Sequence, residues 1–486
     1  MSSLDLARIQ FALTTLFHFV FVPVTIGLAW LVAIMQTAWR RTGNPEWYRL
    51  TRFFGKLLLI NVAIGVGTGI VQEFEFGMNW SSYSRYVGDV FGAPLAIEGL
   101  AAFFLEATFL GIWIFGWNRL SPKLHLATIY LAALGATLSA VFILAANSWM
   151  QHPVGYTINK QTGRAQLDDI GAVFTNKVFL WALPHTILAS FVIASTLVLS
   201  VSAWHLRRRN STDAFRRAAV MALIVLFPAS GLALFTGART AVTITEVQPM
   251  KTAAMEALWD TEGPASFSLI QIGGMEEDDQ TPVFDIEIPH LLSILATGSW
   301  NGEVKGMTPL QNAEQQQFGP GNYRPTVQFT YWSLRIMAYF GTIMALLSAY
   351  GLWLVYRRKL VESRRFLRVS IWSLILPYCI LLSGWVLAET GRQPWIVWGL
   401  QKTADGVSGT VSTTEVAVTL GGFALLYVIL GSVYFGLIRK FARQDLEPAP
   451  AFVDFRDRFT DDDDDHPRGS DDFDDRTPLD VPALSY

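Results

Sequence analysis

The first long apolar segment of the chain is Ala12–Gln36, ALTTLFHFVFVPVTIGLAWLVAIMQ, and it predicts the class of fold. It contains no Asp, Glu, Lys or Arg, and its length exceeds the roughly 20 residues that a helix needs to cross the hydrocarbon core of a membrane. A helix satisfies its own backbone hydrogen bonds, which lipid cannot do. The segment also lacks a basic leader and a small-residue cleavage site, so we expect a retained membrane-spanning helix and not a signal peptide.

Eight further apolar stretches of similar length follow this one. Only 16% of the 486 residues are charged, against about 25% in a typical soluble protein, and 51% are hydrophobic. The sequence therefore predicts an all-α, polytopic membrane protein with about nine transmembrane helices. The later spans are expected at Gly55–Glu75, Pro94–Trp117, Leu126–Asn147, Phe179–Trp204, Ala218–Thr236, Gln328–Tyr356, Ser370–Glu389 and Glu415–Ile438.

Lys and Arg residues cluster in every second connection between the spans, and this pattern predicts the orientation of the chain in the membrane. Cytoplasmic loops carry the excess of these residues. The basic clusters follow the first, third, fifth and seventh spans, which places the N-terminus outside and the C-terminus in the cytoplasm. Because they are short and separated by apolar runs, they indicate topology and not a nucleic-acid surface. They comprise Arg40, Arg41, Arg49 and Arg52; Arg119 and Lys123; Arg207–Arg209, Arg216 and Arg217; and Arg357, Arg358, Lys359, Arg364, Arg365 and Arg368.

The chain is expected to have a membrane body and a tail. Residues 1–446 form the predicted transmembrane domain, which includes a long outer connection at 237–327. Residues 447–486 contain thirteen acidic and four basic residues, so we expect a disordered cytoplasmic tail. The single cysteine, Cys379, lies in an apolar run, which excludes a disulfide framework and thiolate-bound zinc or iron–sulfur centres in this chain.

Ionisable and ligand-type side chains gather at one depth of the predicted bundle. Such groups are costly in a membrane and are default functional candidates. With the predicted orientation, Glu106 lies about 12 Å deeper than Glu98, by helical rise. The outer layer contains His18, Gln72, Glu73, Glu75, Glu98, His185, Arg335, Met337 and Glu389.

Each of these residues also has an ordinary structural explanation. A membrane histidine can be a hydrogen-bonded packing residue, and methionine commonly fills gaps in a core. Glu98 and Glu106 could form part of a buried ion-pair arrangement, and Glu73 and Glu75 could be solvated charges at a helix end, which we favour. The turn at 391–395 could be a helix cap, with Pro394 as a stop and Trp395 in the aromatic belt.

The convergence of His, Met and carboxylate at one depth indicates haem. Haem iron takes His, Met or an anionic oxygen as axial ligand. A His and Met pair suits a six-coordinate electron-transfer haem, whereas a lone His or Glu leaves a position open for oxygen. Only His18 and His185 lie inside the predicted spans, too few for a haem–copper oxidase or a bis-histidine cytochrome b.

Five motifs resemble subunit I of the cytochrome bd-type quinol oxidases, and the resemblance extends from Leu6 to Arg443. They are GAPLAIEGLAAFFLEATFLG (Gly92–Gly111), ANSWMQHPVG (Ala146–Gly155), QPMKTAAMEALW (Gln248–Trp259), WSLRIM (Trp332–Met337) and GRQPW (Gly391–Trp395).

The resemblance implies three haems and their ligands. His185 and Met337 would bind the iron of the low-spin haem b (b558), with Arg335 nearby. His18 and Glu389 would ligate the irons of the high-spin haem b (b595) and haem d. Which of the two binds haem d is left open.

The resemblance also implies roles for residues around these ligands. Trp385 would line the high-spin site, and Glu98 would lie near the haem d pocket. Glu106 with Ser139 would form a proton route, and Asn147 and Arg392 would lie around the haem propionates or the haem cluster. Lys251 and Glu256 match the quinol-site residues of an outer loop of the short type, and their spacing places both on neighbouring faces of a short helix.

The implied protein is a terminal oxidase subunit. It would oxidise menaquinol or ubiquinol at the outer face of the bacterial cytoplasmic membrane and reduce O2 to water, generating a proton motive force without pumping. Its implied partners are subunit II, in a membrane heterodimer, and a small accessory membrane subunit, with no nucleic acid. Two alternatives stay open: a transporter or channel, and a haem protein that carries electrons without reducing oxygen.

Overall fold

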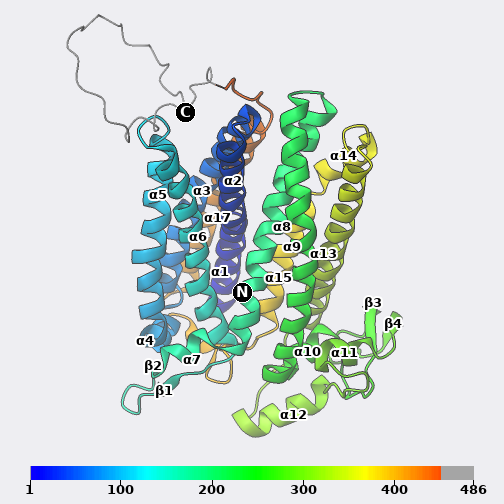
Figure 1. Ribbon diagram of the computed structural model, residues 1–486. Coiled ribbons are helices and arrows are strands. Elements are labelled where there is room, and N and C mark those ends of the chain that lie inside the picture. The colour runs from blue at the N-terminus through cyan, green and yellow to red at the C-terminus, as the bar shows by residue number, and fades with distance from the viewer. Residues whose placement is uncertain (1, 450–486) are drawn as a thin grey trace, which may run out of the picture. The chain divides into compact units, whose positions relative to one another are not determined.

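The structure, a computed structural model, describes residues 2–449 and is almost entirely helical (Figure 1). Three two-stranded antiparallel hairpins accompany the helices. The elements are α1 (Ser3–Phe19), α2 (Val22–Thr42), α3 (Pro45–Met78), α4 (Ser81–Ile97), η1 (Glu98–Phe103), α5 (Phe104–Phe115), α6 (Pro122–Gln151), β1 (Tyr156–Ile158), β2 (Ala165–Leu167), α7 (Ile170–Phe174), α8 (Lys177–Arg207), α9 (Thr212–Val247), α10 (Pro249–Met255), β3 (Phe267–Gly273), β4 (Pro282–Ile288), α11 (Leu291–Thr297), α12 (Met307–Phe318), α13 (Val327–Tyr356), α14 (Arg364–Trp372), α15 (Ile375–Thr390), β5 (Trp395–Val397), β6 (Gln401–Lys402), α16 (Thr403–Gly406) and α17 (Thr413–Phe441).

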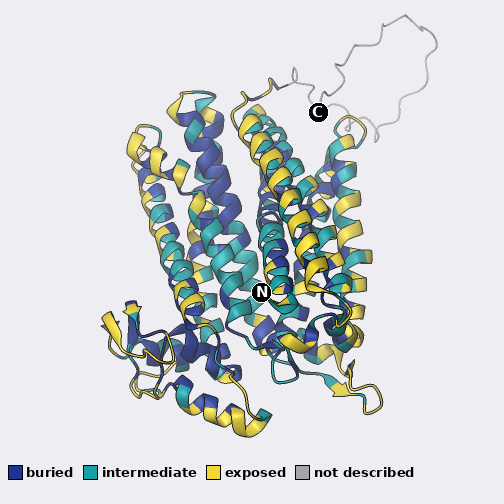
Figure 2. Cartoon of the chain, turned by 180° about the vertical axis from the view of Figure 1, so that it is seen from behind, coloured by how far each residue is buried: buried dark blue, intermediate teal, exposed yellow. Residues whose placement is uncertain are grey.

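Nine stretches within residues 2–449 are long and apolar enough to cross a membrane, which confirms the predicted all-α polytopic fold. The largest buried apolar cluster joins α2, α3, α6, α8 and α9. Figure 2 shows that exposed residues mark the outer faces of the bundle and that buried residues concentrate between the helices. α2 and α8 approach so closely that a Cβ on Gly27 would lie 2.1 Å from the Ser190 carbonyl oxygen. Small residues commonly permit such backbone contact between membrane helices.

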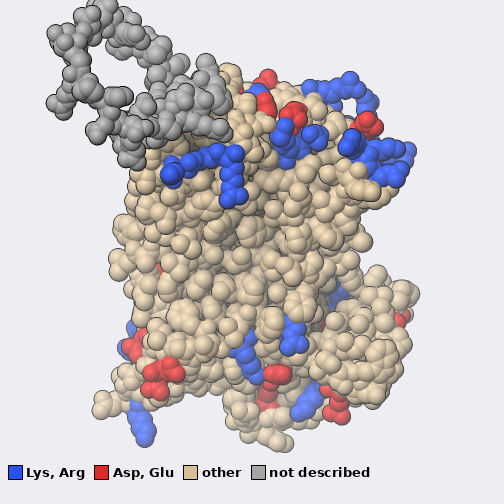
Figure 3. Space-filling view, in the orientation of Figure 1, with Lys and Arg blue, Asp and Glu red and all other residues tan. Residues whose placement is uncertain are grey.

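The two ends of the bundle differ in charge and in structure. Lys and Arg side chains gather at the end that carries α14 and the α2–α3 and α8–α9 connections (Figure 3). The opposite end carries α10, α11, α12 and the hairpins β1–β2 and β3–β4 (Figure 1). We call these the basic end and the loop end.

The first predicted span is two helices in the structure. α1 ends at Phe19 and α2 begins at Val22, with Pro23 in the first turn of α2. Proline lacks an amide hydrogen and clashes with the preceding turn, so it favours a helix start over a helix interior. Together the two helices extend over Ser3–Thr42, well beyond the predicted bounds.

The third predicted span is longer and less regular than expected. It begins at Ser81, thirteen residues before the predicted start at Pro94, and it contains the π-helical segment η1 at Glu98–Phe103. π-helical turns inside α-helices are frequent at functional sites.

The long connection predicted at 237–327 is shorter in the structure. α9 continues to Val247 and ends immediately before Gln248 and Pro249, because a residue before proline disfavours helical backbone angles. The connection then folds into α10, the β3–β4 hairpin, α11 and α12 before α13 begins at Val327.

The tail predicted at 447–486 lies outside the described residues from 450 onward. Glu447 belongs to the compact body, which ends at this residue. Its carboxylate lies 3.2 Å from Lys56 Nζ and 4.0 Å from an Arg52 nitrogen, both on α3.

Candidate functional site

A cavity of about 1280 Å³ collects most of the predicted site residues. Eleven of the thirteen line it, and they come from helices that are far apart in the sequence. They are His18, Glu98, Glu106, Ser139, Asn147, His185, Lys251, Met337, Trp385, Glu389 and Arg392. The two that do not line it are Glu256 and Arg335.

Both cavity histidines are held through Nδ1. His185 Nδ1 lies 3.0 Å from the Ala233 carbonyl oxygen, which can only accept, so this nitrogen carries the proton. His18 Nδ1 lies 2.9 Å from Thr68 Oγ1, and the Thr68 hydroxyl donates to the Gly65 carbonyl oxygen over 2.8 Å. Each ring is therefore the tautomer whose Nε2 has a free lone pair, as in histidines that ligate metal. This donor chemistry fits axial ligation of haem iron.

A glycine faces each of three predicted ligands. A Cβ on Gly69 would lie 3.1 Å from His18 Cε1, and one on Gly237 would lie 3.2 Å from His185 Cε1. A Cβ on Gly384 would lie 3.2 Å from Met337 Sδ. The side chains predicted to bind iron thus have space that any larger residue would reduce.

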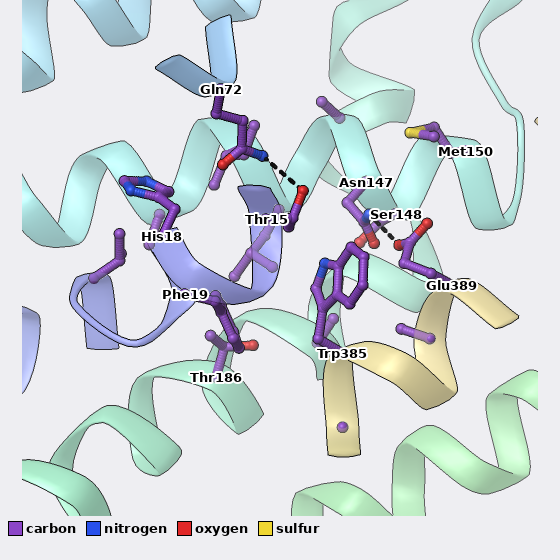
Figure 4. A pocket seen from close by; sticks show the side chains of 18 of the residues that line it. Thr15, His18, Phe19, Gln72, Asn147, Ser148, Met150, Thr186, Trp385 and Glu389 are labelled. Carbon is purple, nitrogen blue, oxygen red and sulfur yellow. Dashed lines mark hydrogen bonds between the residues drawn. The ribbon is translucent and has the colours of Figure 1, made fainter. Parts of the chain in front are cut away.

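Glu389 is held from two sides near the C-terminal end of α15. Its carboxylate accepts a hydrogen bond from Asn147 Nδ2 over 2.9 Å and forms an ion pair with Arg392. Figure 4 shows Trp385 and Glu389 projecting from the same helix toward Asn147, while His18 lies across the pocket. Arg392 Nη1 is buried without a partner among the described residues, so the guanidinium has a donor available for a further anionic group.

The two carboxylates of the third span differ in their contact with Ser139. Ser139 Oγ lies 2.5 Å from Glu98 Oε1, so the hydroxyl donates to Glu98 and not to Glu106. Glu98 and Glu106 nevertheless line the same cavity. The structure thus brings Ser139 and both carboxylates together, with Glu98 nearest to the serine.

Lys251 projects from the loop-end helix α10 into the cavity lining. Its ammonium donates to Gln151 Oε1 over 3.1 Å and to the Ala388 carbonyl oxygen over 2.9 Å. Burial is the main cause that lowers the pKa of Lys251 to about 7; the charge of Arg392 acts in the same direction, and that of Glu389 opposes it. An amine with this pKa can gain or lose a proton near neutral pH.

Glu256 is the C-cap of α10 and its side chain meets Arg335 on α13. Its carboxylate accepts from Arg335 Nη2 over 2.7 Å, and the same guanidinium donates to the carbonyl oxygens of Met255 and Ser268. Burial raises the pKa of Glu256, and the adjacent Arg335 opposes that rise. Arg335, predicted near a haem, is therefore bound to the loop.

The expectation of solvated charges at the end of the second span is wrong for Glu75. This side chain is fully buried, and Gln10 Nε2 donates to its Oε1 over 2.7 Å. Packing of α1 against α3 covers it. Glu73, by contrast, is exposed and lines the cavity.

Two residues around Lys251 were missed in the sequence. Gln151 and Gln248 are both buried, and Gln248 Nε2 donates to Gln151 Oε1 over 3.1 Å. Gln151 follows Asn147 by four residues, so both lie on one face of α6. That four-residue spacing from Asn147 is the feature of the sequence that could have identified Gln151.

Comparisons with known proteins agree on one family. The family model described as cytochrome bd terminal oxidase subunit I matches residues 6–446. Cytochrome bd ubiquinol oxidase subunit 1 of Bacillus subtilis (strain 168) is 44% identical over 451 residues, covering 92% of this chain and 95% of that protein. Cytochrome bd-II ubiquinol oxidase subunit 1 of Escherichia coli (strain K12) is 36% identical, with coverage of 90% and 96%. The structure of the bd oxidase from Geobacillus thermodenitrificans superposes with a TM-score of 0.82 at 29% identity, covering 91% of this chain and 99% of that one.

Proposed function

The chain belongs to the family of cytochrome bd terminal oxidase subunit I, so it is part of a quinol:oxygen oxidoreductase of the bacterial plasma membrane, and we propose how its residues divide that reaction. The haems, when bound, supply the redox chemistry, and the protein positions and tunes them. The observation that carries the assignment is the single cavity lined by His18, His185, Met337 and Glu389.

His185 and Met337 would hold a low-spin haem b (b558), which would pass electrons onward. The free Nε2 of His185 and the space left by Gly384 beside Met337 Sδ support this pairing. His18 and Glu389 would hold the high-spin haem b (b595) and haem d, with Trp385 against the same site. The unpaired Nη1 of Arg392 and the amide of Asn147 suit the propionates of these groups.

Lys251 would bind quinol and Glu256 would accept a released proton. A positioned carboxylate serves as a general base. Lys251 lines the cavity, so a quinol head group bonded to its ammonium would lie beside the proposed haem ligands. Ubiquinol and menaquinol offer the same hydroxyls to this site.

Glu106, Ser139 and Glu98 would carry protons toward the oxygen-reducing site. Intramembrane carboxylates are suitable relays. With the basic end in the cytoplasm, by the excess of Lys and Arg in cytoplasmic loops, the N-terminus and the loop end lie outside. Protons consumed from inside, together with quinol oxidation outside, would generate a proton motive force without a pump.

Subunit II would cover the flank formed by α3, η1 and α5. Glu73 is exposed on this flank among the exposed side chains of Ile70, Phe74 and Leu100. A carboxylate facing lipid is costly, so a protein partner is the favoured cover. A small accessory membrane subunit would complete the assembly.

The purified complex tests this function with two measurements. A reduced-minus-oxidised spectrum should show low-spin haem b, high-spin haem b and haem d, and quinol should drive oxygen uptake. A colourless protein would support a transporter or channel. Haem bands without oxygen uptake would support an electron carrier.

A further inference from the structure

Gln151 occupies a junction between three segments of the chain. It is the last residue of α6 and is 3% exposed. Its Nε2 donates to the Ala388 carbonyl oxygen over 3.1 Å, and its Oε1 accepts from Lys251 Nζ, also over 3.1 Å. One side-chain amide therefore binds the loop helix α10 and the end of α15 at once.

The contacts form a closed triangle. Lys251 Nζ also donates directly to the Ala388 carbonyl oxygen over 2.9 Å, so each of the three groups bonds the other two. A Cβ on Gly391 would lie 2.8 Å from Lys251 Cγ, which shows how closely the lysine stem packs on the chain after α15. Gln248 adds a further hydrogen bond to Gln151 Oε1.

The triangle adjoins Glu389 in two ways. Ala388 precedes Glu389 in the chain, and Asn147, one turn before Gln151 on α6, donates to the Glu389 carboxylate over 2.9 Å. One face of α6 thus holds two consecutive residues of α15, one through its carbonyl and one through its side chain. Displacement of the Ala388 carbonyl would therefore also move the Glu389 side chain.

We infer that Gln151 is a positioning residue that couples Lys251 of the loop to Glu389 of the cavity. The inference rests on the proposed function, in which a quinol hydroxyl binds the Lys251 ammonium. The ammonium has three N–H donors, of which Gln151 and Ala388 take two, so a quinol hydroxyl bound to the third draws Nζ away from the Ala388 carbonyl. Gln151 then remains as the link between α10 and the end of α15. Through this link, quinol binding changes the position of the Glu389 side chain.

The test uses Gln151→Met in the complete oxidase complex. Methionine keeps the length and approximate volume of glutamine but removes the hydrogen bonds of its side-chain amide. In the wild type, adding an oxidised short-chain quinone should shift the absorption bands of the high-spin haems. In Gln151→Met that shift should be lost and the KM for quinol should rise roughly tenfold, since two buried hydrogen bonds to Lys251 and Ala388 disappear. Oxygen uptake with a direct chemical reductant should remain.

Gln311→Met is the matched control. Gln311 is also a buried glutamine of the loop region, donating to the Gly321 carbonyl oxygen over 2.7 Å and accepting from the Tyr323 amide over 2.9 Å. Neither of these hydrogen bonds involves Lys251 or Ala388, so the quinone-induced shift and the KM should stay near wild type. If Gln151→Met does not assemble, Gln151→Glu carries the test: paired with Lys251, the ionised carboxylate accepts from the ammonium but cannot donate to Ala388, so the quinone-induced shift should be lost.

Three results would overturn the coupling: no quinone-induced shift in the wild type, a normal shift in Gln151→Met, or an equal loss in Gln311→Met. Each is distinct from failure of the proposed function. That failure would appear as a wild-type complex without haem or without quinol-driven oxygen uptake.

Discussion

Arg335 and Glu256 form an ion pair at 2.7 Å with side chains that are 1% and 5% exposed. Arg335 lies on α13 two residues before Met337, whereas Glu256 caps α10 in the loop region. One buried contact thus connects the segment that carries a proposed haem ligand to the segment proposed to handle quinol. Removing one partner of such a pair leaves an uncompensated buried charge, which is strongly destabilising.

Glu256→Gln should lower quinol oxidation by roughly 10² or more, because the amide cannot accept a proton as a general base. The variant loses the opposite charge of the pair, but its amide oxygen can still accept from Arg335, and the guanidinium keeps its hydrogen bonds to the carbonyl oxygens of Met255 and Ser268. We therefore expect lower stability but retained haems. Steady-state oxygen uptake with quinol and with a direct chemical reductant separates the two effects. Glu262→Gln, an exposed change in the same loop region, serves as the control. A normal quinol rate, or loss of haem, in Glu256→Gln would contradict the assignment.

Met337→Leu should abolish six-coordination of the low-spin haem b with little effect on folding, because leucine is nearly isosteric but has no ligand atom. The reduced-minus-oxidised spectrum of the variant reports this directly. Met344→Leu is the matched control, since Met344 lies on the same helix, is buried and does not line the cavity. An unchanged low-spin spectrum in Met337→Leu would refute the pairing with His185.

His18→Ala should remove an oxygen-reactive haem and its carbon monoxide binding while the low-spin haem remains. The reason is that His18 reaches the cavity from α1, on a different helix from His185 and Met337. Carbon monoxide difference spectra provide the measurement. Carbon monoxide binding at the wild-type level would rule out His18 as a ligand of that site.

Gly69→Ala should disturb the same haem although His18 itself is unchanged. The new Cβ would lie 3.1 Å from His18 Cε1, whereas a Cβ on Gly67 of the same helix meets no atom within 4 Å. We expect Gly69→Ala to shift the high-spin bands and reduce oxygen uptake several-fold, and Gly67→Ala to leave both unchanged or to stabilise α3 by up to about 1 kcal/mol. Identical spectra for the two variants would show that the contact at Gly69 is irrelevant.

Glu314→Gln should stabilise the loop region above neutral pH. Burial raises the pKa of Glu314 from 4.5 to about 7. Between these two pH values the native state therefore holds a proton on Glu314 that the unfolded state has released. The contribution of Glu314 to the free energy of unfolding is fully present below about pH 4.5 and is lost as the pH rises through about 7. The variant should gain on the order of 2 kcal/mol over wild type at pH 8 but little at pH 4.5. Limited proteolysis of the loop at both pH values measures the difference, and an equal effect at each would contradict it.

Much of the architecture could be predicted because the membrane imposes it. Runs of apolar residues must be helices, and their length sets their number. The layer of candidate ligands also followed from depth along each span, and His18, His185, Met337 and Glu389 do line one cavity.

The features that were not predicted depend on contacts between distant segments. Glu75 looked like a charge at a helix end, but its burial is determined by Gln10 on another helix. The motif of Arg335 predicts a position near a haem but not its hydrogen bonds to Glu256, Met255 and Ser268. Helical spacing within one segment contains no information about which neighbour a polar side chain will meet.

The π-helical segment η1 constrains the length of the chain between Glu98 and Glu106. On a regular helix, eight residues carry the second side chain about 80° beyond two full turns from the first. A wider turn rotates the chain less per residue and brings the two carboxylates nearer to one face, consistent with both lining the cavity. Deleting one residue from 98–103 would restore regular winding and swing the following side chains around the axis. Homologous chains should therefore tolerate substitutions in this segment far better than insertions or deletions.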